Sequence, residues 1–151
     1  MEYYIFIHNG IINGCGQARC LDEDVINAEV SEEVFNNFIE DTDRYIWNGE
    51  EIIENPNYEE IKRQKEEERI ANLTMTALDF INFLKNVGLT DQNIEDYLNA
   101  NLAIKHQLQF CQNVYCGVAK ALMPIKYNGI TITAEMVEQA FRIKNGEGGN
   151  N

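Results

Sequence analysis

The stretch from Lys62 to Arg69 contains eight consecutive residues without one apolar side chain (KRQKEEER). Strong helix formers surround it, and neither Gly nor Pro interrupts the segment after Pro56. Opposite charges recur one turn apart, as in Lys62 and Glu66, and each such pair supports a helix by about 0.2–0.5 kcal/mol. A helix that is polar on every side does not belong inside a core. The sequence therefore predicts an exposed helix between two separately packed bodies.

This helix divides the 151 residues into four expected parts. Residues 1–55 form an acidic α+β head, 56–73 the charged connecting helix, 74–146 a helical domain with one small hairpin, and 147–151 a disordered tail. The expected fold class is α+β.

The head contains two hairpin signals. Asn9-Gly10 separates two short runs of strand-forming residues, and Asn48-Gly49 separates residues 44–47 from residues 50–54. Asn-Gly favours the type I′ turn, in which both central residues need a positive φ. Gly14 and Gly16 suggest a bulge in the second strand, and residues 25–30 suggest a third strand.

Ser31 is placed to cap a short helix that carries Val34, Phe35 and Phe38. A unit of about 55 residues is marginal for folding alone. We therefore expect the head to be stabilised by contacts with the connecting helix, with the second unit or with another copy of the chain. The last of these alternatives would make the protein a homo-oligomer.

The second part reads as helical. Thr76, Thr90 and Thr133 precede apolar-periodic segments as N-caps, and Gly88 stands where a helix C-terminal glycine belongs. Apolar residues from Ile104 to Leu122 recur at alternating intervals of four and three, which predicts one continuous helix ended by Pro124. Asn128-Gly129 predicts a small hairpin after it.

The net charge of −13 is concentrated at one end of the chain. Residues 1–60 hold 15 acidic and 2 basic residues, whereas residues 61–151 hold 10 of each. Direct binding to a nucleic-acid backbone is disfavoured, because phosphate contacts need Lys and Arg. The acidic residues either keep the protein soluble or face a basic protein partner.

No pattern of residues specifies a catalytic or metal chemistry. Cys111 and Cys116 lie on the predicted long helix about 140° apart, so they are not expected to grip one zinc ion, and Cys111 reads as a small buried hydrophobe. Asp22, Asp24 and Glu33 match a calcium loop, but its fifth and sixth positions fail. His8 and His106 read as a strand-end and a surface-helix histidine. No cofactor, metal or enzymatic activity is expected.

The candidate partner-binding residues are the acidic side chains of the head and its single tryptophan. Trp47 is either a core residue or part of an exposed patch. The full set is Asp22, Glu23, Asp24, Glu32, Glu33, Asp41, Asp43, Trp47, Glu50 and Glu51.

Two stretches carry a resemblance to a known class of proteins. Residues 45–60 read YIWNGEEIIENPNYEE and residues 70–80 read IANLTMTALDF, with the charged helix between them. This layout resembles small accessory proteins encoded near the tail genes of tailed bacteriophages and prophages, including tail fibre assembly chaperones.

The resemblance implies a non-enzymatic tail or tail-fibre assembly factor, or a minor tail component, that acts by binding a tail or fibre protein. The alternative is a phage-encoded inhibitor of a host defence nuclease, of the anti-CRISPR type, whose acidic head imitates nucleic acid. No signal peptide and no membrane-spanning run of about 18–20 apolar residues is recognised. The expected location is the cytoplasm of the bacterial host, with later association with the virion left open.

Overall fold

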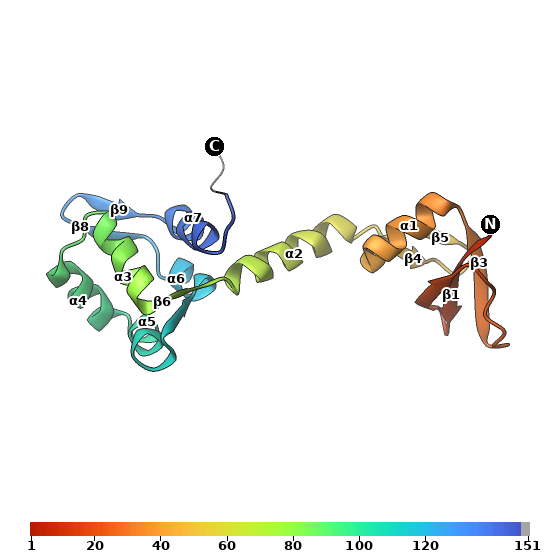
Figure 1. Cartoon of the computed structure of the whole chain (residues 1–151), viewed down its shortest axis with the longest axis horizontal. Coiled ribbons are helices and arrows are strands. Elements are labelled where there is room, and N and C mark those ends of the chain that lie inside the picture. Colours follow the sequence, from red (N-terminus) through yellow and green to blue (C-terminus); the bar gives the residue numbers. More distant parts are fainter. Residues whose placement is uncertain (149–151) are drawn as a thin grey trace. The chain divides into compact units, whose positions relative to one another are not determined.

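A computed structural model describes residues 1–148 of the chain. The protein has a mixed α+β fold, as predicted, and divides into two compact units (Figure 1). The N-terminal unit covers residues 1–64, and the C-terminal unit begins at Lys65. Each unit has its own cluster of buried apolar side chains.

The N-terminal unit is built on a three-stranded antiparallel sheet. Its strands are β1 (Tyr3–His8), β2 (Ile11–Gly16) and β3 (Val25–Val30), in the order β2-β1-β3. Asn9 and Gly10 both have positive φ, at 50° and 76°, so the predicted type I′ turn is confirmed. The predicted bulge is confirmed too, because the register with β2 shifts between Phe6 and Ile7.

One face of this sheet is covered by a helix and a second hairpin. These are α1 (Glu32–Glu40), β4 (Tyr45–Trp47) and β5 (Ile52–Glu54). The side chain of Ser31 caps α1 by accepting a hydrogen bond from the Val34 N–H. Phe38 and Tyr45 then pack on Ile5 and Ile7 from the central strand.

The opposite face is covered by the connection from β2 to β3. Tyr4 is fully buried there, its hydroxyl donates to Glu2 at 2.5 Å, and the Nε of Arg19 donates to the same oxygen at 3.1 Å. The ring of Phe6 occupies the space beside Gly16, where an added Cβ would approach it to 3.0 Å.

The turn of the second hairpin differs from the prediction. Trp47 pairs with Ile52, so four residues connect the strands, and Gly49 has a positive φ whereas Asn48 does not. The reason is local: the Asn48 side-chain oxygen accepts from the backbone N–H groups of Glu50 and Glu51 at 2.8 and 2.9 Å. An Asx-type turn of this kind competes with the tighter type I′ turn.

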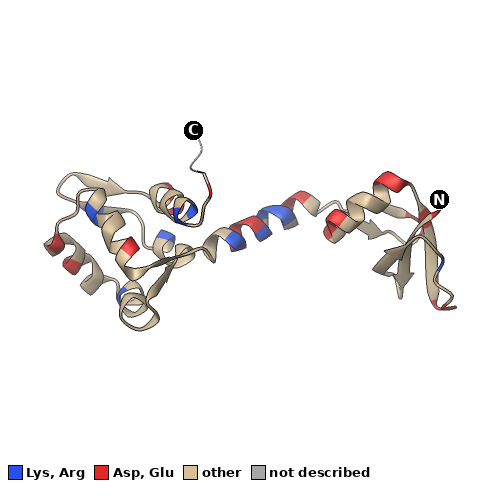
Figure 2. Ribbon diagram, viewed as in Figure 1, with Lys and Arg blue, Asp and Glu red and all other residues tan. Residues whose placement is uncertain are grey.

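A helix forms where the charged stretch predicts one, α2 (Tyr58–Ala71), and all eight residues from Lys62 to Arg69 are exposed. Figure 2 shows residues of both charges along α2. Glu60 forms an ion pair with Arg63 at 2.6 Å, and Glu66 forms one with Arg69 at 2.8 Å. The Tyr58 hydroxyl donates to Asp41 at 2.9 Å within the N-terminal unit. Ile70 is buried in the C-terminal unit.

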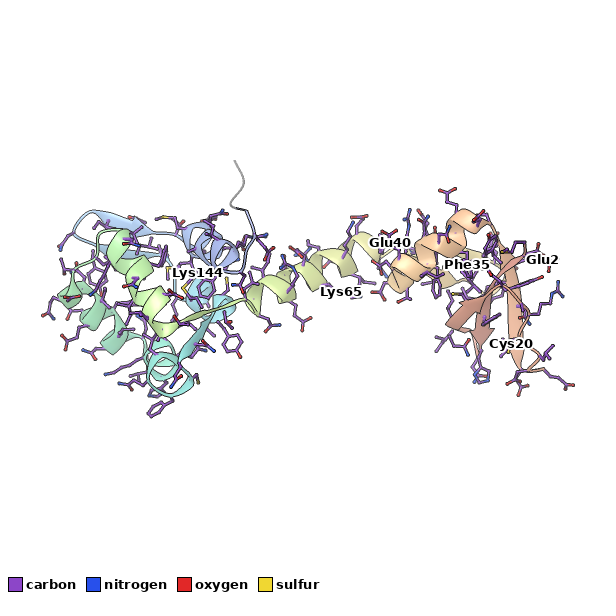
Figure 3. The ribbon with its side chains drawn as sticks, in the orientation of Figure 1. Glu2, Cys20, Phe35, Glu40, Lys65 and Lys144 are labelled. Carbon is purple, nitrogen blue, oxygen red and sulfur yellow. The ribbon has the colours of Figure 1, made fainter. Side chains whose placement is uncertain are left out.

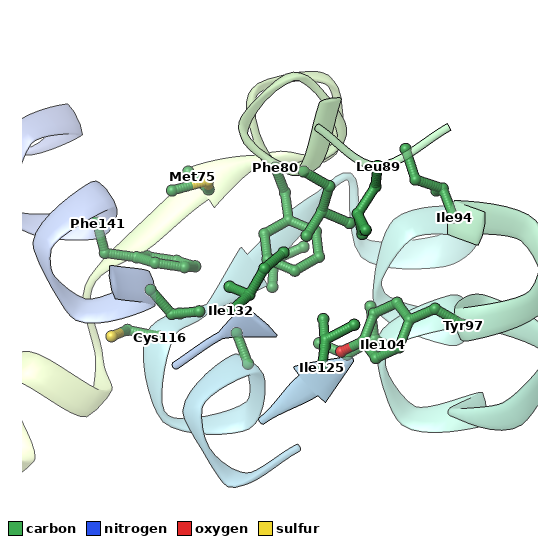
Figure 4. Close-up of a cluster of buried hydrophobic side chains, with 14 of the residues drawn as sticks. Met75, Phe80, Leu89, Ile94, Tyr97, Ile104, Cys116, Ile125, Ile132 and Phe141 are labelled. Carbon is green, nitrogen blue, oxygen red and sulfur yellow. The ribbon is translucent and has the colours of Figure 1, made fainter. Parts of the chain in front are cut away.

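The C-terminal unit packs helices around two small two-stranded sheets, and Figure 4 shows its cluster of buried apolar side chains. Phe80, Leu84, Ile104, Val114 and Phe141 are among its fully buried side chains. Its elements are β6 (Thr74–Thr76), α3 (Ala77–Asn86), α4 (Asp91–Ala100), α5 (Leu102–His106), β7 (Asn113–Tyr115), α6 (Cys116–Ala121), β8 (Ile125–Tyr127), β9 (Ile130–Ile132) and α7 (Ala134–Lys144).

The predicted local signals of this unit are confirmed. Thr76, Thr90 and Thr133 each accept a backbone hydrogen bond as an N-cap, and Thr90 forms a capping box with Asn93. Asn128 and Gly129 take φ values of 48° and 80° in the turn of the predicted hairpin β8–β9.

The continuous helix from Ile104 to Leu122 is wrong. After α5 the chain makes one π-helical turn, Gln107–Cys111, and reverses at Gln112 with a φ of +59°. It then enters β7, which pairs with β6. The Ala77 N–H donates to the Gln112 carbonyl at 2.9 Å, and the Cys116 N–H donates to the Leu73 carbonyl at 2.8 Å. These bonds to a distant segment replace the helical bonds that the apolar spacing predicted.

The expected disordered tail, residues 147–151, is corrected at its first residue. The Glu147 N–H donates to the Arg142 carbonyl at 2.8 Å, and its carboxylate accepts two bonds from Arg69. Residues 149–151 lie outside the described part of the chain.

Candidate protein-binding groove

The acidic candidate residues of the N-terminal unit do not form one face (Figure 2). Asp22, Glu23 and Asp24 precede β3, whereas Glu32 and Glu33 follow it in the first turn of α1. The six residues of β3 separate these two groups by roughly 20 Å. These two groups of carboxylates therefore lie at opposite ends of β3.

Several of these carboxylates stabilise local structure. Asp22 accepts the Asp24 N–H at 3.1 Å, and Asp41 accepts the Asp43 N–H at 3.1 Å. The hydrogen bond from Tyr58 to Asp41 raises the pKa of the tyrosine, and the hydrogen bond between Tyr3 and Glu32 raises the pKa of Tyr3. These groups have roles inside the unit that do not depend on a partner.

A groove of about 490 Å³ runs along β3 and brings together three of the predicted residues. Trp47, Glu50 and Glu51 form one wall, contributed by β4 and the turn after it. Strand β3 forms the other wall from Ile26 onward, and Val34 of α1 contributes as well. We call this feature the edge groove.

The edge groove combines exposed apolar side chains with carboxylates. Ile26 is 51% exposed, although it pairs with the fully buried Ile7 of the central strand. Trp47 is half-buried, so part of the ring packs on the core and part faces the groove. Glu50 and Glu51 are exposed beside it, whereas the exposed Glu29 pairs with Tyr4 and so points to the opposite face of the sheet.

Few cations lie near these carboxylates. Residues 1–60 contain two, Arg19 and Arg44. Arg19 lies over the Tyr4 ring at 5.2 Å and interacts electrostatically with Glu29. Arg44 forms an ion pair with Glu54 at 3.5 Å. The groove is therefore a surface of negative potential beside an exposed apolar side chain.

Sequence reasoning missed Ile26, Ala28 and Glu29 as site residues. The alternation of β3 was readable, but the order β2-β1-β3 was not, and that order makes β3 an edge strand. The four-residue turn that carries Glu50 and Glu51 also depends on a side-chain bond that the Asn-Gly signal does not reveal.

The C-terminal unit has two further depressions. One of about 390 Å³ lies between α3 and α7, where an ion pair joins Asp79 to Lys144 at 2.9 Å. The other, of about 320 Å³, lies beside Gly117 and Ala71. Both depressions are lined mainly by apolar atoms and carry no concentration of one charge. Figure 3 labels Lys144, which lines the first depression from α7.

The cysteine and histidine interpretations have mixed outcomes. Cys111 is exposed, so its reading as a buried hydrophobe is wrong, and Cys116 is buried instead. Burial raises the pKa of the Cys116 thiol. His8 ends β1 and His106 is exposed at the end of α5, so a strand-end and a surface-helix histidine are found as predicted. Within residues 1–148, no cluster of three or more His, Cys, Asp and Glu could hold a metal ion.

No helix in the described part of the chain is both long enough and apolar enough to cross a membrane. Comparisons with protein-family models, with curated proteins and with solved structures gave no match to this chain.

Proposed function

We propose that this protein acts by binding other proteins, as a non-enzymatic accessory factor in the assembly of a bacteriophage tail or tail fibre. The resemblance of residues 45–60 and 70–80 to tail-module accessory proteins supports the phage context. The proposal places the protein in the cytoplasm of the bacterial host during assembly, with a tail or fibre protein as its partner.

The edge groove is the observation that supports protein binding. It combines a half-buried tryptophan, an exposed isoleucine and the two exposed carboxylates of Glu50 and Glu51 on one accessible feature. Aromatic anchors with a charged rim are typical of protein–protein contacts. The groove also includes Trp47 and Glu50–Ile52, which belong to the first of the two stretches that carry the resemblance, residues 45–60.

The nuclease-inhibitor alternative has less support. Imitation of a nucleic acid requires carboxylates in a regular row, because duplex DNA carries one charge per about 1.7 Å of axis. The acidic groups before and after β3 are instead roughly 20 Å apart. We therefore favour the assembly role.

Affinity capture of the full-length chain from bacteria that produce the phage tests this function. We expect recovery of a tail or fibre protein. The amount of captured partner is compared between two charge-reversed double variants. One carries Glu50→Lys and Glu51→Lys in the groove, and the control carries Glu68→Lys and Glu95→Lys at exposed positions elsewhere. Recovery of a host nuclease effector, or of no protein above background, would contradict the proposal.

A further inference from the structure

We propose that β3 accepts an additional strand from its partner: an extended segment in which apolar residues alternate with Lys or Arg. This inference rests on the proposed protein-binding function and names the chemistry of the partner. Three features support it: the position of β3 at the edge of the sheet, the alternation of side chains along β3 and the charge around the edge groove.

Strand β3 lies at one edge of the three-stranded sheet. Among residues 1–148, β3 pairs with another strand on one side only, and the Val25 N–H at its start donates to the Asp22 carbonyl at 3.1 Å. An edge strand presents a row of N–H and C=O groups to a further strand. Natural edges are commonly blocked by Pro, by Lys or by a bulge. The sequence of β3, VINAEV, contains neither residue, and its register with β1 is regular over all six pairs. By contrast, the other edge strand, β2, carries the bulge.

The side chains of β3 define what an added strand would meet on each face. Ile26 and Ala28 pair with the core residues Ile7 and Ile5, so they point to the face that holds the groove. Glu29 points to the other face. An added strand therefore places every second side chain over Ile26 and Trp47, where an apolar residue fits. The remaining side chains pass Glu29.

The charge favours a basic partner over a second copy of the chain. Two N-terminal units joined at β3 would bring Glu29, Glu50 and Glu51 of each copy close to the same acidic groups of the other. Like charges placed opposite one another destabilise strand pairing. Lys or Arg side chains that alternate with the apolar ones on a partner strand would instead pass Glu29 on one face of the sheet, while Glu50 and Glu51 add negative charge on the groove face. The occupant is therefore a different, basic segment.

The test uses the full-length protein and a fluorescent peptide, Ac-KVTVRVTK-amide. We expect binding at low salt that weakens as salt screens the charges. Amide hydrogen exchange should slow within residues 25–30, because outward N–H groups of an edge strand gain partners in the added strand. A peptide with every second backbone nitrogen methylated should bind about tenfold more weakly or not at all, because it lacks those hydrogen bonds.

Two matched variants locate the site. Ile26→Lys adds a cation on the groove face, whereas Ile39→Lys adds the same cation on α1, and both native side chains are more than half exposed. We expect Ile26→Lys to weaken peptide binding about tenfold and Ile39→Lys to leave it unchanged. Glu50→Lys with Glu51→Lys should weaken it similarly, and Glu68→Lys with Glu95→Lys should not.

Three results would overturn the inference: no binding at about 1 mM peptide, equal binding of the methylated peptide, or protection confined to the C-terminal unit. These outcomes are separate from the function itself. A tail or fibre protein captured equally well by wild type and Ile26→Lys would uphold the assembly role and reject the added strand. Failure to capture any such protein would reject the assembly role.

Discussion

At the scale of single residues, close approach explains why some positions accept only small side chains. Gly117 lies at the start of α6, and a Cβ added there would come within 3.0 Å of the Ala71 Cβ and 3.3 Å of the Ala71 carbonyl oxygen. A backbone atom cannot move aside as a flexible side chain can. The contact joins α6 to the end of α2 inside the C-terminal unit.

Gly117→Val should therefore destabilise the protein by about 1–3 kcal/mol through overpacking. Ala121→Val, at an exposed position of the same helix, is the control and should change stability by less. Denaturant unfolding followed by circular dichroism measures both. Equal stability of Gly117→Val and wild type would show that this contact is looser than described.

Side-chain charge at one end of the C-terminal unit predicts acid sensitivity. Hydrogen bonds from Arg69 lower the pKa of Glu66 and of Glu147 below 4.5, and a hydrogen bond from Lys120 lowers that of Glu138. A carboxyl whose pKa is depressed by folding stabilises the native state above its unfolded pKa. That stabilisation is lost as the pH falls through the lower folded value.

The melting temperature of the C-terminal unit should thus fall as the pH drops below about 4.5, through the lowered pKa values of these carboxyl groups. Glu138→Gln should lower it at neutral pH and make this fall shallower, because one of the titrating groups is gone. Differential scanning calorimetry across that range gives the comparison. An unchanged pH dependence in Glu138→Gln would mean that this ion pair contributes nothing to acid sensitivity.

At the scale of elements, local signals were readable and long-range pairing was not. The caps Ser31, Thr76, Thr90 and Thr133 were predicted because each depends on a hydrogen bond to a residue three positions away. The strands β6 and β7 pair across about forty residues of chain, so nothing near Val114 announces their ladder. The apolar spacing there fitted a helix equally well.

The same limit applies to the candidate site. Trp47, Glu50 and Glu51 could be singled out from composition and from the turn signal. Ile26 and Glu29 became site residues only when the strand order placed β3 at an edge. Sheet order is set by contacts between distant segments, which an amphipathic pattern in a single strand does not encode.

At the scale of the whole molecule, the chain has two cores and an exposed helical stretch in its sequence between them. Eight exposed residues separate Ile61 from the buried Ile70. Ile5 and Ile7 belong to the N-terminal core and Phe141 to the C-terminal core. Since the two clusters share no residue, a substitution that loosens the packing of one core should not directly destabilise the other.

Phe141→Ala tests this separation. Truncating a fully buried phenylalanine costs about 3–5 kcal/mol. We expect amide exchange to accelerate throughout α3 and α7 while β1 and β3 keep the protection of the wild type. Equal acceleration in both units would show that they unfold as one cooperative body.

The most direct test of the account is photo-crosslinking from the edge groove in bacteria that produce the phage. A photoreactive phenylalanine replaces Ile26 in the full-length chain, and a control chain carries it in place of Ile39. We expect a crosslink from position 26, but not from position 39, to a basic, extended segment of a tail or fibre protein. Equal crosslinking from the two positions, or a crosslink to a nuclease effector, would contradict it.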